Sequence, residues 1–250
     1  MHKTSPKNIL ITGGSRGIGA TFVRQAVEQS YGVCFTYATQ EAQAQALVLE
    51  LATQGVNVAC LQADTGNTAA IAHLFRDAEQ LVGPIDVLVN NAGITGPLGP
   101  FLQTTQDTMQ QVLNVNVLGP MLLSKQAVRA WQARGAKGCI LNVSSIAAKL
   151  GAASEYIHYA AAKGALESFT VGLAKELAAE GIRVNAIAPG TTLTDIHATA
   201  GEPGRPARVA ARIPMQRPGK PEEIAEAMLW LISEKASYVT GAVMPVAGGL

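Results

Sequence analysis

The sequence predicts a single α/β domain, a doubly wound parallel β-sheet of about seven strands with helices on both faces. Short apolar segments of strand-forming residues alternate along the chain with longer segments of helix formers, an order typical of parallel sheets. A length of 250 residues fits one domain, and a hydrophobic fraction of 48% can fill a large core. The chain has no linker, internal repeat or low-complexity tract, so residues 1–250 are expected to form one domain.

The expected strands are short apolar segments rich in Val, Ile and Leu. They span residues 9–11, 33–37, 56–61, 85–89, 139–143, 182–187 and 242–246. The last segment contains Pro245, which cannot donate a backbone hydrogen bond to an inner neighbour. We therefore expect this strand to close the sheet at an edge.

The expected helices are rich in Ala, Leu, Gln and Glu, with apolar residues three and four positions apart. They cover residues 41–54, 69–81 and 159–179, and a late helix follows Pro221. Residues 190–218 break the alternation, because they carry several Pro, Gly, Thr and Arg residues without a clean period. Such an insertion predicts a substrate lid at about residues 191–217, with an irregular surface excursion as the alternative.

Composition argues against several classes of partner. Lys and Arg number 19 against 18 Asp and Glu, and no basic or acidic tract stands out, so neither a nucleic acid nor an anionic membrane is an expected partner. The amino terminus lacks an apolar signal core, and no apolar run is long enough to span a bilayer. Cys34, Cys60 and Cys139 lie in apolar segments without a CxxC pair, which indicates free thiols and a cytoplasmic location.

A glycine-rich segment, residues 12–19 (TGGSRGIG), lies between the first expected strand and a helix. Gly13 and Gly17 allow tight backbone geometry, and Gly19 lets the helix pack against the sheet. The helix amino terminus then offers free N–H groups to a pyrophosphate. A glycine cluster alone is weak evidence for a nucleotide site, but its position after the first strand of a βαβ unit predicts dinucleotide binding.

A second segment, residues 90–93 (NNAG), follows the fourth expected strand, at the sheet edge where open α/β sheets bind ligands. With the TGxxxGxG spacing, it makes the chain resemble the short-chain dehydrogenase/reductase family over nearly its whole length. Within that family the chain is most similar to bacterial ketoacyl-carrier-protein reductases and glucose-dehydrogenase-like oxidoreductases. The resemblance implies a Rossmann-type fold, a ribose site at residues 91–93 and an adenine contact from Asp64, for which a local turn or helix cap is the alternative.

The cofactor preference depends on the end of the second strand. A carboxylate there would bind the ribose 2′-hydroxyl and repel a 2′-phosphate, but this sequence has Tyr37, Ala38 and Thr39. Arg16, inside the glycine loop, is suited to a charge-assisted contact with a phosphate, with an ordinary surface arginine as the alternative. Both features predict NADP(H).

Tyr159 and Lys163 are the expected catalytic pair, because positions i and i+4 share one helix face. A lysine cation and a positive nicotinamide both favour the phenolate, so the pKa of Tyr159 is expected to fall from about 10 toward neutrality. Tyr159 could then exchange a proton with a carbonyl or alcohol oxygen. Tyr156 has Ala160 four positions on and no lysine partner, so it is expected to shape the substrate pocket.

The family resemblance implies two further catalytic residues. Ser145, at the end of the fifth strand, corresponds to the serine that binds the substrate oxygen, and Ser144 is expected to bond locally to backbone. Asn116 corresponds to the asparagine that holds a proton-relaying water, with Asn114 as its competitor. The sequence Pro189-Gly190, followed by Thr194, resembles the turn that addresses the nicotinamide carboxamide, although an ordinary Pro-Gly turn would explain two of these residues.

The expected cofactor-binding residues form one set. They are Gly13, Ser15, Arg16, Gly17, Ile18, Gly19, Tyr37, Thr39, Asp64, Thr65, Asn91, Ala92, Gly93, Tyr159, Lys163, Pro189, Gly190 and Thr194. No metal site is expected, because His2, His73, His158 and His197 have no metal-ligand spacing.

The expected activity is hydride transfer between NADP(H) and a small ketone or aldehyde. A ketoacyl-thioester reductase, an aldose dehydrogenase and a non-catalytic NADP-binding regulator are the alternatives. The substrate pocket is expected from residues 94–98, Ala147, Tyr156, Thr191 and the lid, whose arginines Arg205, Arg208 and Arg212 are expected to face water rather than an acidic substrate. By family resemblance, the protein is expected to form a homotetramer or dimer.

Overall fold

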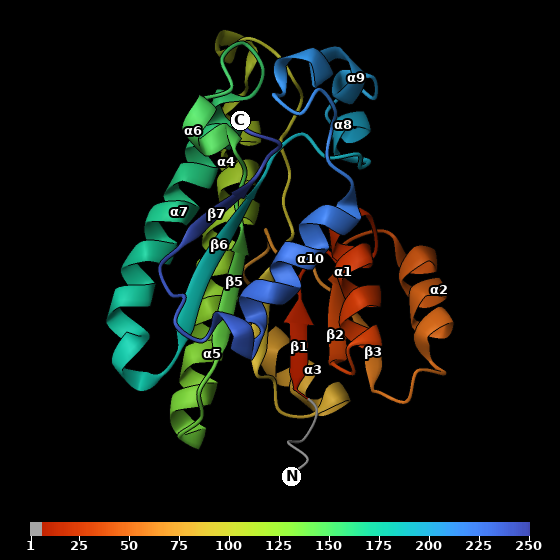
Figure 1. Ribbon diagram of the computed structural model, residues 1–250, viewed down its shortest axis with the longest axis vertical. Coiled ribbons are helices and arrows are strands. Elements are labelled where there is room, and N and C mark those ends of the chain that lie inside the picture. Colours follow the sequence, from red (N-terminus) through yellow and green to blue (C-terminus); the bar gives the residue numbers. More distant parts are fainter. Residues whose placement is uncertain (1–6) are drawn as a thin grey trace.

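The computed structural model describes residues 7–250, and its centre is a parallel sheet (Figure 1). The strand order is β3-β2-β1-β4-β5-β6-β7, with every neighbouring pair parallel. The strands are β1 (Asn8–Ile11), β2 (Gly32–Tyr37), β3 (Val58–Gln62), β4 (Val87–Asn90), β5 (Cys139–Val143), β6 (Arg183–Pro189) and β7 (Val243–Val246). The predicted fold class is confirmed, and β7 with Pro245 lies at an edge as expected.

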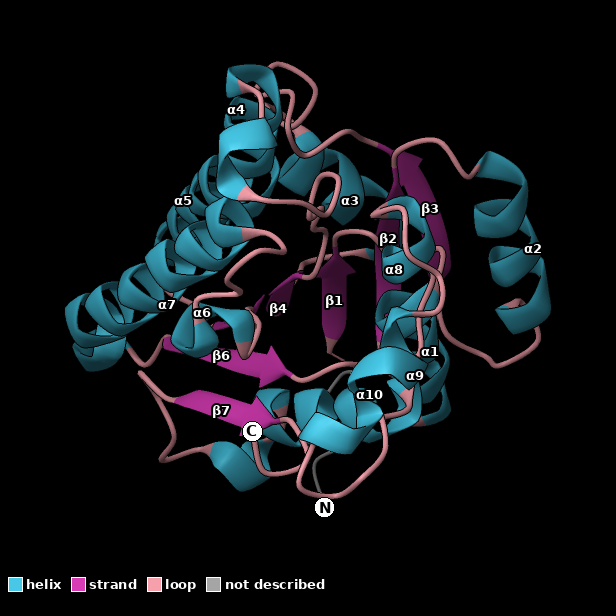
Figure 2. Cartoon of the chain, turned by 90° about the horizontal axis from the view of Figure 1, so that it is seen from above, coloured by secondary structure: helices cyan, strands magenta, loops and turns pink. Residues whose placement is uncertain are grey.

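Helices cover both faces of this sheet (Figure 2). The helices α1 (Gly17–Glu28), α2 (Glu41–Leu51) and α10 (Pro221–Ile232) pack on one face, while α3 (Leu74–Val82), α5 (Gly119–Arg134) and α7 (Ile157–Leu177) pack on the other. The side chains of β1 alternate accordingly, since Ile9 and Ile11 lie in the first core and Leu10 in the second. The three cysteines lie in β2, β3 and β5 as free thiols.

Shorter elements connect these layers. They are η1 (Phe101–Gln103), α4 (Gln106–Leu113), the π-helix η2 (Asn114–Leu118), α6 (Ala147–Leu150), η3 (Ala178–Glu180), α8 (Ile196–Thr199), α9 (Arg205–Val209), η4 (Ala210–Arg212) and η5 (Glu234–Ala236). Within residues 7–250, none of the helices combines the length and the hydrophobicity needed to cross a membrane. His2 and most of the amino-terminal segment examined for a signal lie outside the described residues.

Several predicted boundaries were wrong. The helix expected from residue 69 begins at Leu74, because the side chain of Asn67 accepts hydrogen bonds from the amides of Ala69 and Ala70 and holds a turn there. The helix expected to reach residue 54 ends at Leu51, before a turn in which Gly55 has a φ of 76°. The segment 190–218 is more regular than expected, since it contains α8, α9 and η4.

Residues 191–217, the predicted lid segment, lie beyond the carboxyl ends of the strands. Figure 1 shows α8 and α9 in blue above the arrowheads of the sheet. The backbone ties this segment to its neighbours, because Leu98 donates its N–H to the carbonyl of Ala200 at 3.1 Å. The segment therefore covers the carboxyl edge of the sheet, where parallel sheets bind ligands.

Two side chains anchor the strands that carry the site. Arg183, at the start of β6, donates to the carbonyl oxygens of Leu231, Ile232, Ser233 and Val239, and three of these acceptors are the last residues of α10 and its C-cap. These bonds satisfy carbonyls that a helix end otherwise leaves unpaired.

Trp131 anchors β5 from the opposite side. Its indole is fully buried and donates to the carbonyl of Ile85 at 2.7 Å. Gly138 immediately precedes β5, and a Cβ there would lie 2.2 Å from the Trp131 ring. The absence of a side chain at residue 138 therefore lets the indole pack against the start of the strand.

Candidate active site

A cavity of about 870 Å³ opens at the carboxyl ends of the strands, under the lid segment. Its walls contain all of the predicted cofactor residues, together with Ser145, Tyr159 and Lys163. The residues come from the loops after β1, β2, β3, β4, β5 and β6 and from α7. Residues that are far apart in the sequence thus meet in one space at one edge of the sheet.

The glycine loop has the geometry for close approach of a phosphate. Gly13 and Gly17 have φ angles of 68° and 54°, which favour glycine. A Cβ on Gly19 would lie 2.2 Å from the carbonyl oxygen of Gly13, so no larger residue fits the turn. The loop leads directly into α1, and Ser15 and Ile18, on either side of the first residue of this helix, line the cavity. The amino terminus of α1, with its free N–H groups and the positive end of its dipole, therefore lies at the cavity wall. These features fit a dinucleotide.

Asn91 fastens the glycine loop to the segment after β4. Its side-chain amide donates to the carbonyls of Thr12 and Gly13, both at 2.9 Å. In return, the hydroxyl of Thr12 accepts hydrogen bonds from the backbone N–H groups of Asn91 and Ala92. Asn91 therefore holds the shape of the site with its side chain, in addition to lining it.

The end of β2 presents no carboxylate to the cavity. Tyr37, Ala38, Thr39 and Gln40 line the wall there. Arg16 lines the same end, is exposed, and forms no ion pair with any residue in the range 7–250.

Asp64 and Thr65 lie at the adjoining wall. The carboxylate of Asp64 accepts a hydrogen bond from the N–H of Gly66 at 2.9 Å. The alternative of a local turn former is thus present in the structure, and the same residue also lines the cavity.

Tyr159 and Lys163 lie side by side on the first turns of α7. The ammonium of Lys163 is 5.6 Å from the centroid of the Tyr159 ring and donates to the carbonyl of Val143 at 2.7 Å. Both side chains are buried, with exposed fractions of 8% for Tyr159 and 3% for Lys163. Ser145 borders the same space, and its hydroxyl accepts a hydrogen bond from the N–H of Ala147 at 3.2 Å.

The titration of this pair differs from the expectation. Burial raises the pKa of Tyr159 to about 12, although the Ser145 hydroxyl and the charge of Arg205 act in the opposite direction. Burial also lowers the pKa of Lys163 to about 8. The expected fall in the Tyr159 pKa is therefore not a property of the protein alone, because the loss of hydration outweighs the Ser145 hydrogen bond and the charge of Arg205.

Asn116 is the one predicted catalytic residue that does not line the cavity. It is fully buried within the π-helix η2, and both polar atoms of its amide bind the backbone of Ile94, at 3.0 and 2.7 Å. Its side chain fixes the segment that follows residues 90–93. Ser144 also departs from expectation, since its hydroxyl binds the carboxylate of Glu167 at 2.8 Å as well as the backbone of Lys163.

The loop after β6 closes the cavity from the far side. Pro189, Gly190 and Thr194 line it, and a Cβ on Gly17 would lie 3.3 Å from the Thr194 methyl group. Thr194 therefore packs against the glycine loop. His197 also lines the cavity, with its ring bound to the carbonyl of Thr192, and His158 is buried against the carbonyl of Thr95. In the described part of the chain, no group of three or more His, Cys, Asp and Glu side chains is placed to hold a metal ion.

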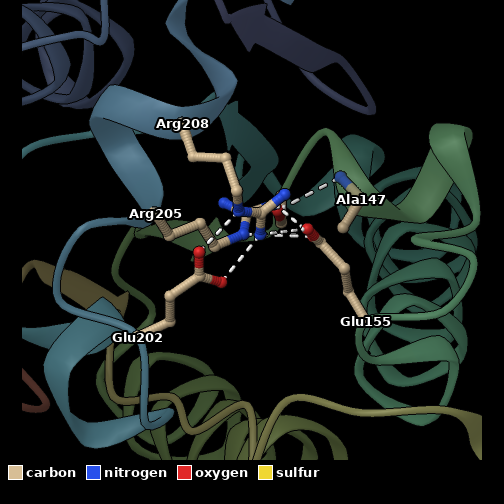
Figure 3. A network of polar contacts seen from close by, with 6 residues as sticks. Ala147, Glu155, Glu202, Arg205 and Arg208 are labelled. Carbon is tan, nitrogen blue, oxygen red and sulfur yellow. Dashed lines mark hydrogen bonds and ion pairs between the residues drawn. The ribbon is translucent and has the colours of Figure 1, made fainter.

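One pair of lining residues was missed from the sequence. Arg205, expected to face water, is buried and donates two hydrogen bonds to Glu155, at 2.5 and 3.1 Å (Figure 3). That expectation was wrong because α9 turns Arg205 inward, over the ring of Tyr156 at 5.2 Å. A sequence feature could have indicated the pair, since Glu155 is the only acidic residue between Ser145 and Lys163.

Comparisons with known proteins agree with this geometry. Residues 13–250 match a family model described as Enoyl-(Acyl carrier protein) reductase. The uncharacterized oxidoreductase YgfF of Escherichia coli (strain K12) is 44% identical over 243 residues, covering 96% of this chain and 98% of that protein.

Solved structures that share the fold include two with a nicotinamide cofactor. A blue fluorescent protein from a metagenomic library, in complex with NADPH, superposes with a TM-score of 0.87 and 36% identity, over 97% of each chain. A 3-ketoacyl-(acyl-carrier-protein) reductase from Brucella melitensis, complexed with NADH, has a TM-score of 0.89 and 30% identity, again over 97% of each chain. The chain belongs to the short-chain dehydrogenase/reductase family and is an NAD(P)-dependent oxidoreductase.

Proposed function

We propose that the protein is an NADPH-dependent carbonyl reductase and alcohol dehydrogenase that acts on a ketone or an aldehyde. The observation that carries this proposal is the single cavity that contains both the glycine loop and the group Ser145, Tyr159 and Lys163. When bound, the nicotinamide cofactor supplies or accepts the hydride. The protein then has to bind the carbonyl oxygen, orient it and exchange one proton with it.

Tyr159 is the acid/base of this reaction. Because burial keeps the pKa of Tyr159 at about 12, its hydroxyl carries a proton at neutral pH and can donate it to the oxygen of a reduced carbonyl. Ser145 orients that oxygen, and Lys163 lies beside the tyrosine ring on the same helix face. For alcohol oxidation the phenol of Tyr159 must first lose its proton. Lys163 alone does not stabilise the phenolate enough for this, so we expect the positive charge of the oxidised cofactor to contribute the remaining stabilisation.

The preference for NADPH rests on the end of β2 and on the glycine loop. No carboxylate lines the wall from Tyr37 to Gln40, so a 2′-phosphate would meet no repulsion there. The guanidinium of Arg16 is exposed and free of ion pairs within residues 7–250, which leaves it available for a bidentate phosphate contact. The NADPH complex of the metagenomic relative supports the same preference.

The substrate end of the cavity favours compounds with apolar substituents. Its walls include Ile94, Leu98, Ala147, Tyr156 and Val209. A 3-ketoacyl thioester is the second candidate, because the relative from Brucella melitensis is named for that substrate.

Assembly and location complete the proposal. We propose a homotetramer or dimer in the cytoplasm. Trp230 and Tyr238 are large apolar side chains exposed near the carboxyl terminus, and the three free thiols suit a reducing compartment.

Oxidation of NADPH, followed by absorbance against a panel of aldehydes, diketones, β-ketoesters and an acetoacetyl thioester, tests the activity. Tyr159→Phe should lower kcat by roughly 10²–10⁴-fold, because it removes the exchangeable proton and leaves the ring in place. Tyr31→Phe, a matched change at a half-buried tyrosine that does not line the cavity, should leave kcat unchanged. Turnover that survives in Tyr159→Phe would refute the assignment, and a preference for NADH would refute the role of Arg16.

A further inference from the structure

The ion pair between Glu155 and Arg205 lies inside the substrate end of the cavity rather than on the surface. The exposed fractions of the two side chains are 19% and 11%, and both residues line the cavity. The guanidinium of Arg205 is 5.2 Å from the centroid of the Tyr156 ring, which in turn lies edge-on to the Tyr159 ring at 5.2 Å. One aromatic ring therefore separates this cation from the proposed acid/base.

The pair belongs to a group of four charges with no net charge. Arg208 donates to Glu155 at 2.8 Å and to Glu202 at 2.7 Å, and Figure 3 shows the two guanidinium groups between the two carboxylates. Arg205 differs from Arg208, because Glu155 is the only carboxylate that its side chain binds within residues 7–250. Burial raises the pKa of Glu155, but the hydrogen bonds from both arginines outweigh it, so the pKa is lowered and the carboxylate stays ionised.

The backbone around the pair is held independently of the charges. The N–H of Gly99 donates to the carbonyl of Glu155 at 2.8 Å, and the N–H of Leu98 donates to the carbonyl of Ala200. A neutral residue of the same shape at position 155 should therefore leave the lid in place. It would also leave a buried arginine without its counter-charge beside the site of reaction.

We propose that Glu155 sets the charge preference of the substrate site: it neutralises Arg205, so that the site takes uncharged carbonyl compounds and rejects those with a carboxylate next to the carbonyl. This inference rests on the proposed function. Without the Glu155 carboxylate, Arg205 would offer a substrate carboxylate the bidentate, charge-assisted contact that Glu155 now occupies. Arg212 also lines the cavity, but it is exposed, so solvent screens its charge.

The test uses two substrates of similar shape and different charge, phenylglyoxylate and its methyl ester. The measured quantity is the ratio of kcat/KM for the acid to kcat/KM for the ester, with NADPH. Glu155→Gln should raise this ratio by at least about tenfold, because it keeps a hydrogen bond to Arg205 and removes only the negative charge. Adding Arg205→Met to Glu155→Gln should abolish the increase. Arg217→Met, which removes a lid arginine paired with Glu223 at the surface, is the matched control and should leave the ratio unchanged.

A second variant covers the case in which Glu155→Gln does not fold. Arg205→Met alone leaves two carboxylates, Glu155 and Glu202, with Arg208 as their one partner in the group of four, so it should lower the ratio by at least about tenfold. An unchanged ratio in the folded variants, or an increase that persists without Arg205, would overturn the inference.

Calorimetry separates this inference from the proposed function. If the wild-type protein reduces neither the ester nor any carbonyl of the panel, the proposed function fails. Binding of phenylglyoxylate to Glu155→Gln should still be at least about tenfold tighter than to the wild type. Equal binding by both proteins would refute the role of Glu155.

Discussion

Arg183 provides a quantitative test of how the sheet and α10 stabilise each other. Its guanidinium donates to the carbonyls of Leu231 at 2.8 Å, Ile232 at 3.1 Å and Ser233 at 3.2 Å, with a longer bond of 3.4 Å to Val239. Replacing Arg183 with Met keeps most of the side-chain stem and removes every donor. The end of α10 would then lose the groups that satisfy its final carbonyls.

The expected cost follows from the number and exposure of these bonds. A hydrogen bond from a charged donor contributes about 1.5–3 kcal/mol, but Arg183 is only half-buried and water can replace part of the contact. We therefore expect Arg183→Met to lower the free energy of unfolding by roughly 2–3 kcal/mol. For a chain of this length that corresponds to a fall in Tm of roughly 4–12 °C.

Urea unfolding followed by circular dichroism, together with thermal unfolding, would measure this loss. Arg24→Met is the matched control, because Arg24 forms an exposed ion pair with Glu50 and should contribute at most about 1 kcal/mol. If Arg183→Met were no more destabilising than Arg24→Met, the capping role of Arg183 would be wrong.

Two further predictions concern β5 and Lys163. Gly138→Ala should destabilise the protein by about 1–3 kcal/mol, because the added methyl group would lie 2.2 Å from the buried Trp131 ring. Gly164→Ala is the control and should not destabilise the protein, because its Cβ would meet open space. Equal unfolding midpoints for the two variants would contradict this prediction. Burial lowers the pKa of Lys163 to about 8, against 10.5 for a free lysine, so between these pH values the unfolded chain binds more protons than the folded one. The free energy of unfolding of the wild type, measured relative to Lys163→Met, should therefore rise from pH 8 to pH 10.5, and a falling difference would refute the burial of the charge.

Much of the fold follows from sequence patterns that are local. Alternating strand and helix segments predict the parallel sheet, and Pro245 predicts the edge position of β7. Boundaries were less accurate where a side chain competes with the helix, as Asn67 does before α3. The glycine loop could be identified because backbone geometry restricts residue type at Gly13 and Gly17.

The substrate end was harder to predict from the sequence. The pairing of Glu155 with Arg205 joins residues 50 positions apart, and nothing in local periodicity indicates that α9 turns one arginine inward and leaves Arg208 partly exposed. The pKa of Tyr159 was misjudged for a related reason. A sequence shows a lysine four positions from Tyr159 but not the burial that raises the pKa of the tyrosine.

The bridge between Thr12 and Asn91 has a consequence for how the molecule folds. These residues are 79 positions apart, and the loop that their contact closes contains both β2 and β3. Contacts between residues so far apart in the sequence form slowly, because the chain loses conformational entropy on closing the loop before the contact contributes its favourable energy. We therefore expect the pocket at the glycine loop to form late in folding, so that a ligand bound there would report on the native state. A dinucleotide at a hundredfold excess over its Kd would add about 2.7 kcal/mol to the free energy of unfolding, so the cellular pool of cofactor also acts as a reserve of stability.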